Sequence, residues 1–120
     1  MGRIQGDLKE RTFEFAVQVL ALVDGLPRST KGWVVGRQLV RSGTAIGANV
    51  READHAHTDA DFAYKCSVAR KEASETEYWL ELCNRSAMVK SDRVHPLAVE
   101  AGELMRILAT IVKRTQDHLS

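Results

Sequence analysis

Two glycines one helical turn apart, Gly43 and Gly47, constrain the fold of this chain more than any other feature. They lie within residues 38–53, QLVRSGTAIGANVREA, whose apolar residues recur at helical spacing. A glycine inside a helix costs about 1 kcal/mol relative to alanine, so another interaction has to offset this cost. Without side chains at these positions, a second helix can approach the bare face closely. We therefore predict that Gly43 and Gly47 form the contact face of a tightly packed helix pair.

The composition and the periodicity favour an all-α domain. The chain has 120 residues, enough for one domain with a single core, and only 6% of them are aromatic. No segment alternates between apolar and polar residues as a half-buried strand would. We predict an up-down-up-down antiparallel four-helix bundle in a single domain of residues 1–120. Its helices are expected at residues 7–24, 32–54, 59–89 and 92–117.

Two of these helices carry a pattern of small or apolar residues at alternating spacings of four and three. Such a pattern forms the seam along which helices pack in bundles and coiled coils. In residues 59–89 the seam consists of Phe62, Cys66, Ala69, Ala73, Thr76, Leu80, Cys83 and Ala87. In residues 92–117 it consists of Leu97, Ala101, Leu104, Leu108, Ile111 and Thr115.

Charge and hydropathy limit the classes of function. The formal net charge is +1, which does not indicate a nucleic-acid partner, although residues 28–55 hold five basic and two acidic residues. No apolar run reaches the roughly 18 residues of a membrane span, so we expect no membrane insertion. Cys66 and Cys83 would stand about 25 Å apart on one helix and cannot bridge each other. Two reduced thiols predict a cytoplasmic protein.

Three segments together resemble one bacterial protein family. They are DLKERTFEFA near the N-terminus, QLVRSGTAIGANVREA, and the stretch from Asp61-Phe62 through Lys71-Glu72-Ala73 and Glu75-Thr76 to Tyr78-Trp79-Leu80. The chain resembles the four-helix-bundle proteins named after intervening sequences in 23S ribosomal RNA genes. Accessory variability proteins of diversity-generating retroelements are similar to a lesser degree. The resemblance implies an up-down bundle that assembles as a barrel-like homopentamer, and it implies nucleic-acid association only loosely.

A stripe of alternating aromatic and basic residues in the third helix suggests RNA or DNA as a partner. Its members are seven residues apart and lie opposite the seam, so bases would stack on the rings while the cations neutralise phosphates. With nearby cations, the candidate nucleic-acid-binding residues are Arg37, Arg41, Tyr64, Lys65, Arg70, Lys71, Tyr78 and Arg85. The alternative is a solvated or subunit-facing stripe whose long side chains cover their neighbours.

Glu72 and Glu75, one turn apart beside the seam, have two interpretations. Paired carboxylates can serve as acid and base in catalysis. Carboxylates at the edge of a core more often pair with cations, and we predict an ion pair from Arg41 to Glu72 or Glu75 that fixes the helix register. The chain has no phosphate loop, CxxC pair or nucleophile elbow, so we predict neither enzymatic activity nor a small-molecule substrate.

Polar residues gather around the connection between the second and third helices. Their types suit zinc or manganese: Asp54, His55, His57, Asp59 and Asp61. Glu52-Ala53-Asp54-His55 also matches the Glu-x-x-His motif of di-iron bundles, which needs a second motif at the same depth. The nearest candidate, Asp92–His95, would fall at the opposite end of the bundle. We therefore predict a polar loop with helix caps, no metal and no cofactor.

The chain has more apolar surface than one narrow core uses. The surplus residues, our candidates for a subunit interface, are Phe13, Val17, Leu20, Val68, Trp79 and Leu82. A small monomer would expose them as a patch of the kind that marks an interface, whereas the alternative is a wide core. We therefore predict a non-enzymatic self-assembling bundle, with RNA or DNA bound at its basic and aromatic surface. The alternative is an oligomeric scaffold or protein-interaction module without nucleic acid.

Overall fold

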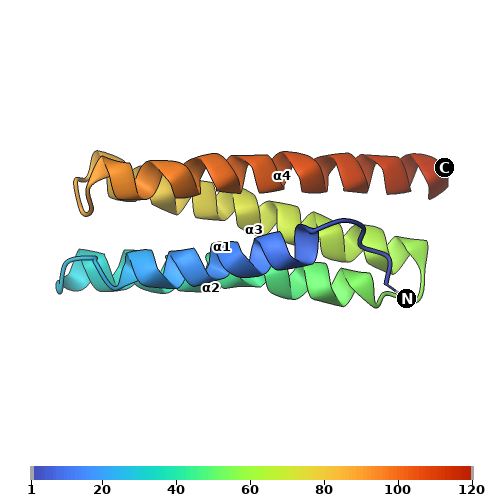
Figure 1. The fold of residues 1–120 in the computed structure, drawn as a ribbon, viewed down its shortest axis with the longest axis horizontal. Coiled ribbons are helices and arrows are strands. Elements are labelled where there is room, and N and C mark those ends of the chain that lie inside the picture. Colours follow the sequence, from blue (N-terminus) through green and yellow to red (C-terminus); the bar gives the residue numbers. More distant parts are fainter. Residues whose placement is uncertain (1, 120) are drawn as a thin grey trace.

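The computed structural model describes residues 2–119, which form four long helices and no β-strand. The helices are α1 (Leu8–Val23), α2 (Thr30–Asp54), α3 (Asp59–Arg85) and α4 (Ser91–Leu119). They run alternately up and down, with the α1–α2 and α3–α4 connections at one end of the molecule and the α2–α3 connection at the other (Figure 1). The predicted antiparallel four-helix bundle is confirmed. None of the described helices is long and apolar enough to cross a membrane.

Each helix packs against its neighbours in the sequence, and α1 also contacts α4. The predicted seam of α3 is buried from Phe62 to Cys83. In α4 the seam is buried as far as Leu108, but Val112 then replaces Ile111 as the buried residue. The buried seam shifts by one residue because a straight helix has 3.6 residues per turn, so a strict seven-residue repeat drifts around the helix.

Side-chain caps set the starts of two helices. The Gly32 amide donates to Ser29 Oγ at 3.4 Å, and α2 begins at Thr30, two residues before the predicted start. The Asp61 amide donates to Thr58 Oγ1 at 3.0 Å, and α3 begins directly after this cap. Each cap satisfies an amide that has no partner within its own helix.

The end of α3 at Arg85, four residues before the predicted end, is a correction. The Met88 amide donates to the Cys83 carbonyl at 3.1 Å and the Ala87 amide to the Asn84 carbonyl at 3.1 Å. This pair of bonds is a Schellman ending, which needs a left-handed residue, and Ala87 supplies it with φ 54°. Glycine usually takes this position, so the sequence lacked the usual stop signal. Ala87, predicted in the seam, is exposed instead.

Replacing Ala87 with glycine should stabilise the protein. A left-handed conformation costs an L-residue about 1 kcal/mol or more, and glycine avoids this cost. The greater freedom of glycine in the unfolded chain offsets part of the gain, so we expect the free energy of unfolding to rise by about 0.5 kcal/mol. Urea denaturation would measure this change. Ser86→Gly is the matched control, since Ser86 has an ordinary φ of −86° and glycine there should destabilise. A lower stability for Ala87→Gly would contradict the prediction.

Candidate functional site

Gly43 and Gly47 lie against α1, where they allow the close approach of the two helices. A Cβ atom at Gly43 would stand 2.9 Å from Val19 Cγ1, and one at Gly47 would stand 3.2 Å from Thr12 Oγ1. Val19 and Thr12 are fully buried. Gly36 continues this edge, where a Cβ would lie 3.3 Å from Val23 Cγ1 at the end of α1 and 3.3 Å from Leu26 Cδ1 just after it. The edge of α2 without side chains is therefore the surface on which α1 rests.

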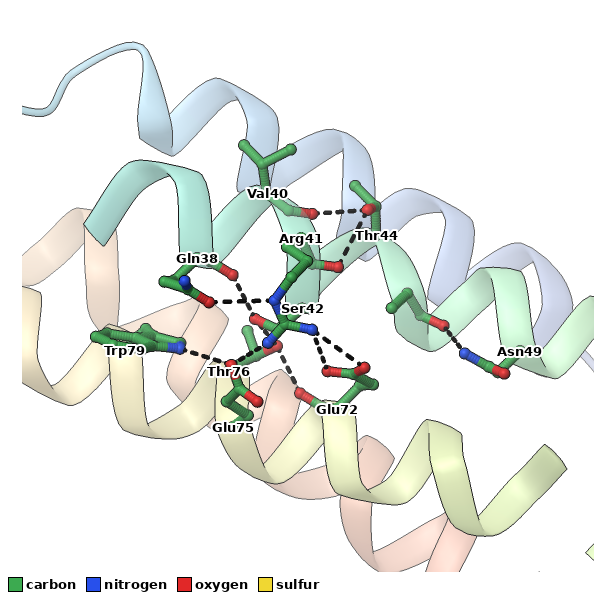
Figure 2. A network of polar contacts seen from close by, with 11 residues as sticks. Gln38, Val40, Arg41, Ser42, Thr44, Asn49, Glu72, Glu75, Thr76 and Trp79 are labelled. Atoms are coloured by element: carbon green, nitrogen blue, oxygen red, sulfur yellow. Dashed lines mark hydrogen bonds and ion pairs between the residues drawn. The ribbon is translucent and has the colours of Figure 1, made fainter. Parts of the chain in front are cut away.

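Arg41 connects α2 to α3 through two carboxylates (Figure 2). Its Nη1 lies 3.2 Å from Glu72 Oε1, and its Nη2 pairs with Glu75 Oε2. Trp79 Nε1 also donates to Glu75 Oε2, at 3.0 Å. The Trp79 indole first, and then Arg41, lower the pKa of Glu75, while the hydrogen bond to Glu75 raises the pKa of Arg41. Both groups therefore stay charged at neutral pH, which suits an ion pair better than proton transfer.

A buried polar contact lies beneath this ion pair (Figure 2). The hydroxyl oxygens of Ser42 in α2 and Thr76 in α3 lie 2.9 Å apart, and both residues are fully buried. Ser42 Oγ also donates to the Gln38 carbonyl at 2.9 Å. Thr76 Oγ1 likewise lies 2.7 Å from the Glu72 carbonyl of its own helix, so a shift of one helix along the other would break the contact between the two hydroxyls but leave each its own carbonyl acceptor. The contact and the ion pair thus specify the same register of α2 and α3.

The aromatic members of the predicted nucleic-acid stripe are open to solvent. Tyr64 and Tyr78 are 63% and 58% exposed, and Lys71 between them is exposed as well. The Tyr78 ring meets Trp79 edge to face, with ring centroids 5.0 Å apart. This packing holds one tyrosine ring in place and leaves most of its surface free for another ring.

Several of the predicted nucleic-acid cations are paired with carboxylates of the same chain. Arg41 pairs as described above, Lys65 Nζ lies 3.0 Å from Glu52 Oε1, and Arg85 Nη2 lies 3.0 Å from Glu81 Oε2. Within residues 2–119 the structure records no ion pair for the remaining three, which are Arg37, Arg70 and Lys71. The positive charge available to a polyanion is therefore smaller than the sequence suggests.

The six predicted interface residues form two separate groups. In α1, Phe13, Val17 and Leu20 are 49%, 46% and 46% exposed. In α3, Trp79 and Leu82 are half-buried against the core and Val68 is half-buried too. Since α1 and α3 both pack on α2 and not on each other, α2 separates the two groups. We name the first group, Phe13 with Val17 and Leu20, the α1 stripe.

An open groove at the end of α2 was not expected from the sequence. It has a volume of about 640 Å³, and Trp33, which is 62% exposed, contributes to its lining. The helical period could have indicated this groove, because Trp33 falls outside the apolar face that Leu39, Ile46 and Val50 define. An exposed tryptophan on a helix with a complete apolar stripe therefore needs a role other than the core.

The N-terminal segment binds the polar residues near the α2–α3 connection. The Ile4 amide and Lys9 Nζ donate to the carboxylate of Asp54, at 2.7 Å and 2.8 Å, and Asp54 is only 3% exposed. Arg3 Nη1 lies 2.6 Å from Asp59 Oδ1. No three potential metal ligands come together in the described part of the chain. These carboxylates anchor the N-terminal segment to the bundle.

Asp54 should make stability depend on pH in the acid range. The hydrogen bond from Lys9, followed by the one from the Ile4 amide, lowers the pKa of Asp54 in the folded state. Its contribution to stability is therefore complete well above the unfolded pKa of about 3.9 and is lost as the pH falls through the lower folded pKa. We expect Asp54→Asn to lower Tm at neutral pH and the difference from wild type to shrink as the pH approaches about 3. Thermal denaturation followed by circular dichroism would show this, with exposed Asp61→Asn as control. A difference that does not change with pH would disprove the role of the charge.

Both cysteines are buried inside the bundle, and their thiols are unreactive there. Burial raises the pKa of the Cys66 thiol and that of the Cys83 thiol to about 11. The thiolate is the reactive form of cysteine, and at neutral pH these groups are protonated. Neither residue therefore has the environment of a catalytic nucleophile.

Over most of its length the chain is similar to known proteins. Residues 6–110 match the family described as 23S rRNA-intervening sequence protein. A solved structure from Bacteroides thetaiotaomicron, described as a protein with unknown function from the S23 ribosomal protein family, is 40% identical with a TM-score of 0.82. That similarity covers 88% of this chain and 98% of the other. No curated protein matches the chain. The resemblance inferred from the helical motifs is confirmed, and the chain belongs to the family of 23S rRNA-intervening sequence proteins.

Proposed function

We propose that this protein is a non-enzymatic, self-assembling four-helix bundle in which the α1 stripe is a contact between copies. The supporting observation is the exposure of Phe13, Val17 and Leu20, each close to half exposed on one side of a single helix. Phe15 and Val19 of α1 are buried in the core on another side of the helix, so the α1 stripe is a second apolar face. Contiguous apolar surface of this kind is uncommon on monomers and marks interfaces.

The surroundings of the stripe also suit an interface. Glu14 and Gln18 on the same helix are exposed, and the Arg51 guanidinium lies 5.0 Å from the centroid of the Phe13 ring. Interfaces commonly have an apolar centre with a polar, arginine-containing surround. We expect a homopentamer, as the family resemblance implies. We also expect the protein in the cytoplasm, because Cys66 and Cys83 are free thiols.

Light scattering on a matched pair of variants would test the assembly. Wild type should have a mass several times that of the 13.4 kDa chain, and five times that mass for a pentamer. Val17→Glu places a charge in the stripe at an exposed position and should dissociate the oligomer without unfolding the subunit. Val99→Glu on α4, where the side chain is 48% exposed, is the control and should leave the mass unchanged. A monomeric wild type at high concentration would end this proposal, as would an unchanged mass for Val17→Glu.

A second candidate function is the binding of single-stranded RNA along α3. The exposed rings of Tyr64 and Tyr78 on either side of Lys71 favour it, since bases stack on such rings and a cation nearby binds phosphate. The name of the family refers to ribosomal RNA, which agrees with this choice of partner. Fluorescence anisotropy with a labelled oligonucleotide should show affinity that falls steeply with salt, and Tyr64→Ala with Tyr78→Ala should weaken it. If the affinity did not change with salt, this second function would be ruled out and only the scaffold function would remain.

A further inference from the structure

The open groove lies at the end of the bundle where α1 connects to α2. Val23, Leu26 and Val40 give it apolar lining, and the exposed Trp33 lies beside them. Its volume of about 640 Å³ is within the range of about 300–1,000 Å³ that small-molecule sites occupy. The groove therefore has the size and the apolar surface to hold the ring system of a small ligand.

The groove also carries positive charge. Arg28, Arg37 and Arg41 contribute to its lining, whereas Asp24 is its single carboxylate among the described residues. Arg41 is engaged with α3, but within residues 2–119 no ion pair is recorded for Arg28 or Arg37. Guanidinium groups bind phosphate through two parallel hydrogen bonds, which a lysine does not reproduce. Arg28 and Arg37 are both exposed, so a phosphate-bearing ligand can reach their guanidinium groups without displacing a carboxylate.

The spacing of Trp33 and Arg37 sets the shape of the ligand. The two residues are one helical turn apart on α2, which places their Cβ atoms about 5–6 Å from each other. None of the ring contacts recorded within residues 2–119 involves Trp33, so its indole faces are open to a stacking partner. A nucleoside separates its base from its 5′ phosphate by a comparable length. Base stacking on an aromatic side chain with a cation beside it is a common mode of nucleotide recognition.

We propose that this groove binds a 5′-phosphorylated nucleotide, with the base stacked on Trp33 and the phosphate held by Arg28 and Arg37. An acidic peptide would use the same arginines, but it would leave the planar indole and the small apolar lining without a matching ring. The site differs from the α1 stripe and from the tyrosines of α3, and it is complete within one subunit. It therefore stands whether or not the bundle self-assembles or binds RNA along α3.

Isothermal titration calorimetry of the full chain with 5′-AMP would test the site. We expect saturable binding of 5′-AMP and at least about tenfold weaker binding of adenosine, which lacks the phosphate. Trp33→Leu and Arg37→Gln should each weaken the Kd for 5′-AMP about tenfold, equivalent to about 1.4 kcal/mol. Arg114→Gln on α4 is the matched control and should bind as wild type does, since Arg114 is exposed and no ion pair is recorded for it within the described residues.

Further arms separate this proposal from the others. Val17→Glu and Tyr64→Ala should keep the affinity for 5′-AMP, because neither residue lines the groove. Loss of binding in either variant would overturn a site contained in one subunit's groove. Three results would overturn the nucleotide assignment. They are no binding of 5′-AMP at millimolar concentration, equal affinity for 5′-AMP and adenosine, and binding of a glutamate-rich peptide but not of 5′-AMP.

Discussion

Gly43→Val should lower the free energy of unfolding by about 3 kcal/mol, the upper part of the usual range for an overpacked core. The first added carbon would lie 2.9 Å from Val19 Cγ1 and 3.1 Å from Val19 Cγ2, so both methyl groups of the neighbour obstruct it. Val19 is fully buried and β-branched, and it has little freedom to rotate away. The two helices must therefore move apart, which loses contacts along the whole α1–α2 edge.

Two controls isolate this close approach. Gly102→Ala in α4 would meet the end of the Glu77 side chain at 3.0 Å and that of Arg106 at 3.4 Å, and both can move. This variant should gain up to about 1 kcal/mol from helix propensity. Val19→Ala combined with Gly43→Val moves the bulk from one helix to the other, and a double-mutant cycle by urea denaturation should give a favourable coupling of about 1 kcal/mol or more. Zero coupling would show that the two residues do not compete for the same space.

Phe15→Ala should lower the free energy of unfolding by about 3–5 kcal/mol, as expected for a large cavity in a core. Phe15 is 1% exposed and packs among buried residues of the bundle. Phe13, two residues earlier in the same helix, is 49% exposed and offers a matched control. We expect Phe13→Ala to change the stability of the isolated subunit by less than about 1 kcal/mol, because about half of this residue is already in water.

The same pair of variants distinguishes the core from the interface. Self-association makes stability depend on protein concentration, so denaturation should be measured at two concentrations and compared with the mass in solution. Phe13→Ala should weaken this concentration dependence, whereas Phe15→Ala should lower stability at every concentration. If Phe13→Ala were as destabilising as Phe15→Ala in a monomeric background, Phe13 would belong to the core and the α1 stripe would lose its strongest member.

The local pattern of residues was sufficient to predict the helices and their buried faces. The seam from Phe62 to Cys83 is buried as predicted, because alternate spacings of four and three place side chains on one side of a helix. The residues at which helices begin and end were predicted less accurately from this pattern. Where Ser29 or Thr58 provides a cap, a sequence signal exists, but the ending after Arg85 in α3 depends on Ala87, which has a left-handed conformation that alanine seldom adopts.

The ion pair of Arg41 with Glu72 and Glu75 was predicted from the sequence, but most of the other surfaces that face one another were established only by packing. Periodicity gives the direction of a side chain around its own helix, but not which neighbour, if any, fills that direction. The separation of Trp79 and Leu82 from the α1 stripe follows from the diagonal arrangement of α1 and α3. The pairing of Lys65 with Glu52, the hold of Asp54 on the N-terminal segment and the groove beside Trp33 likewise depend on contacts between distant parts of the chain. Such contacts depend on the relative rotation and height of whole helices, which no single segment encodes.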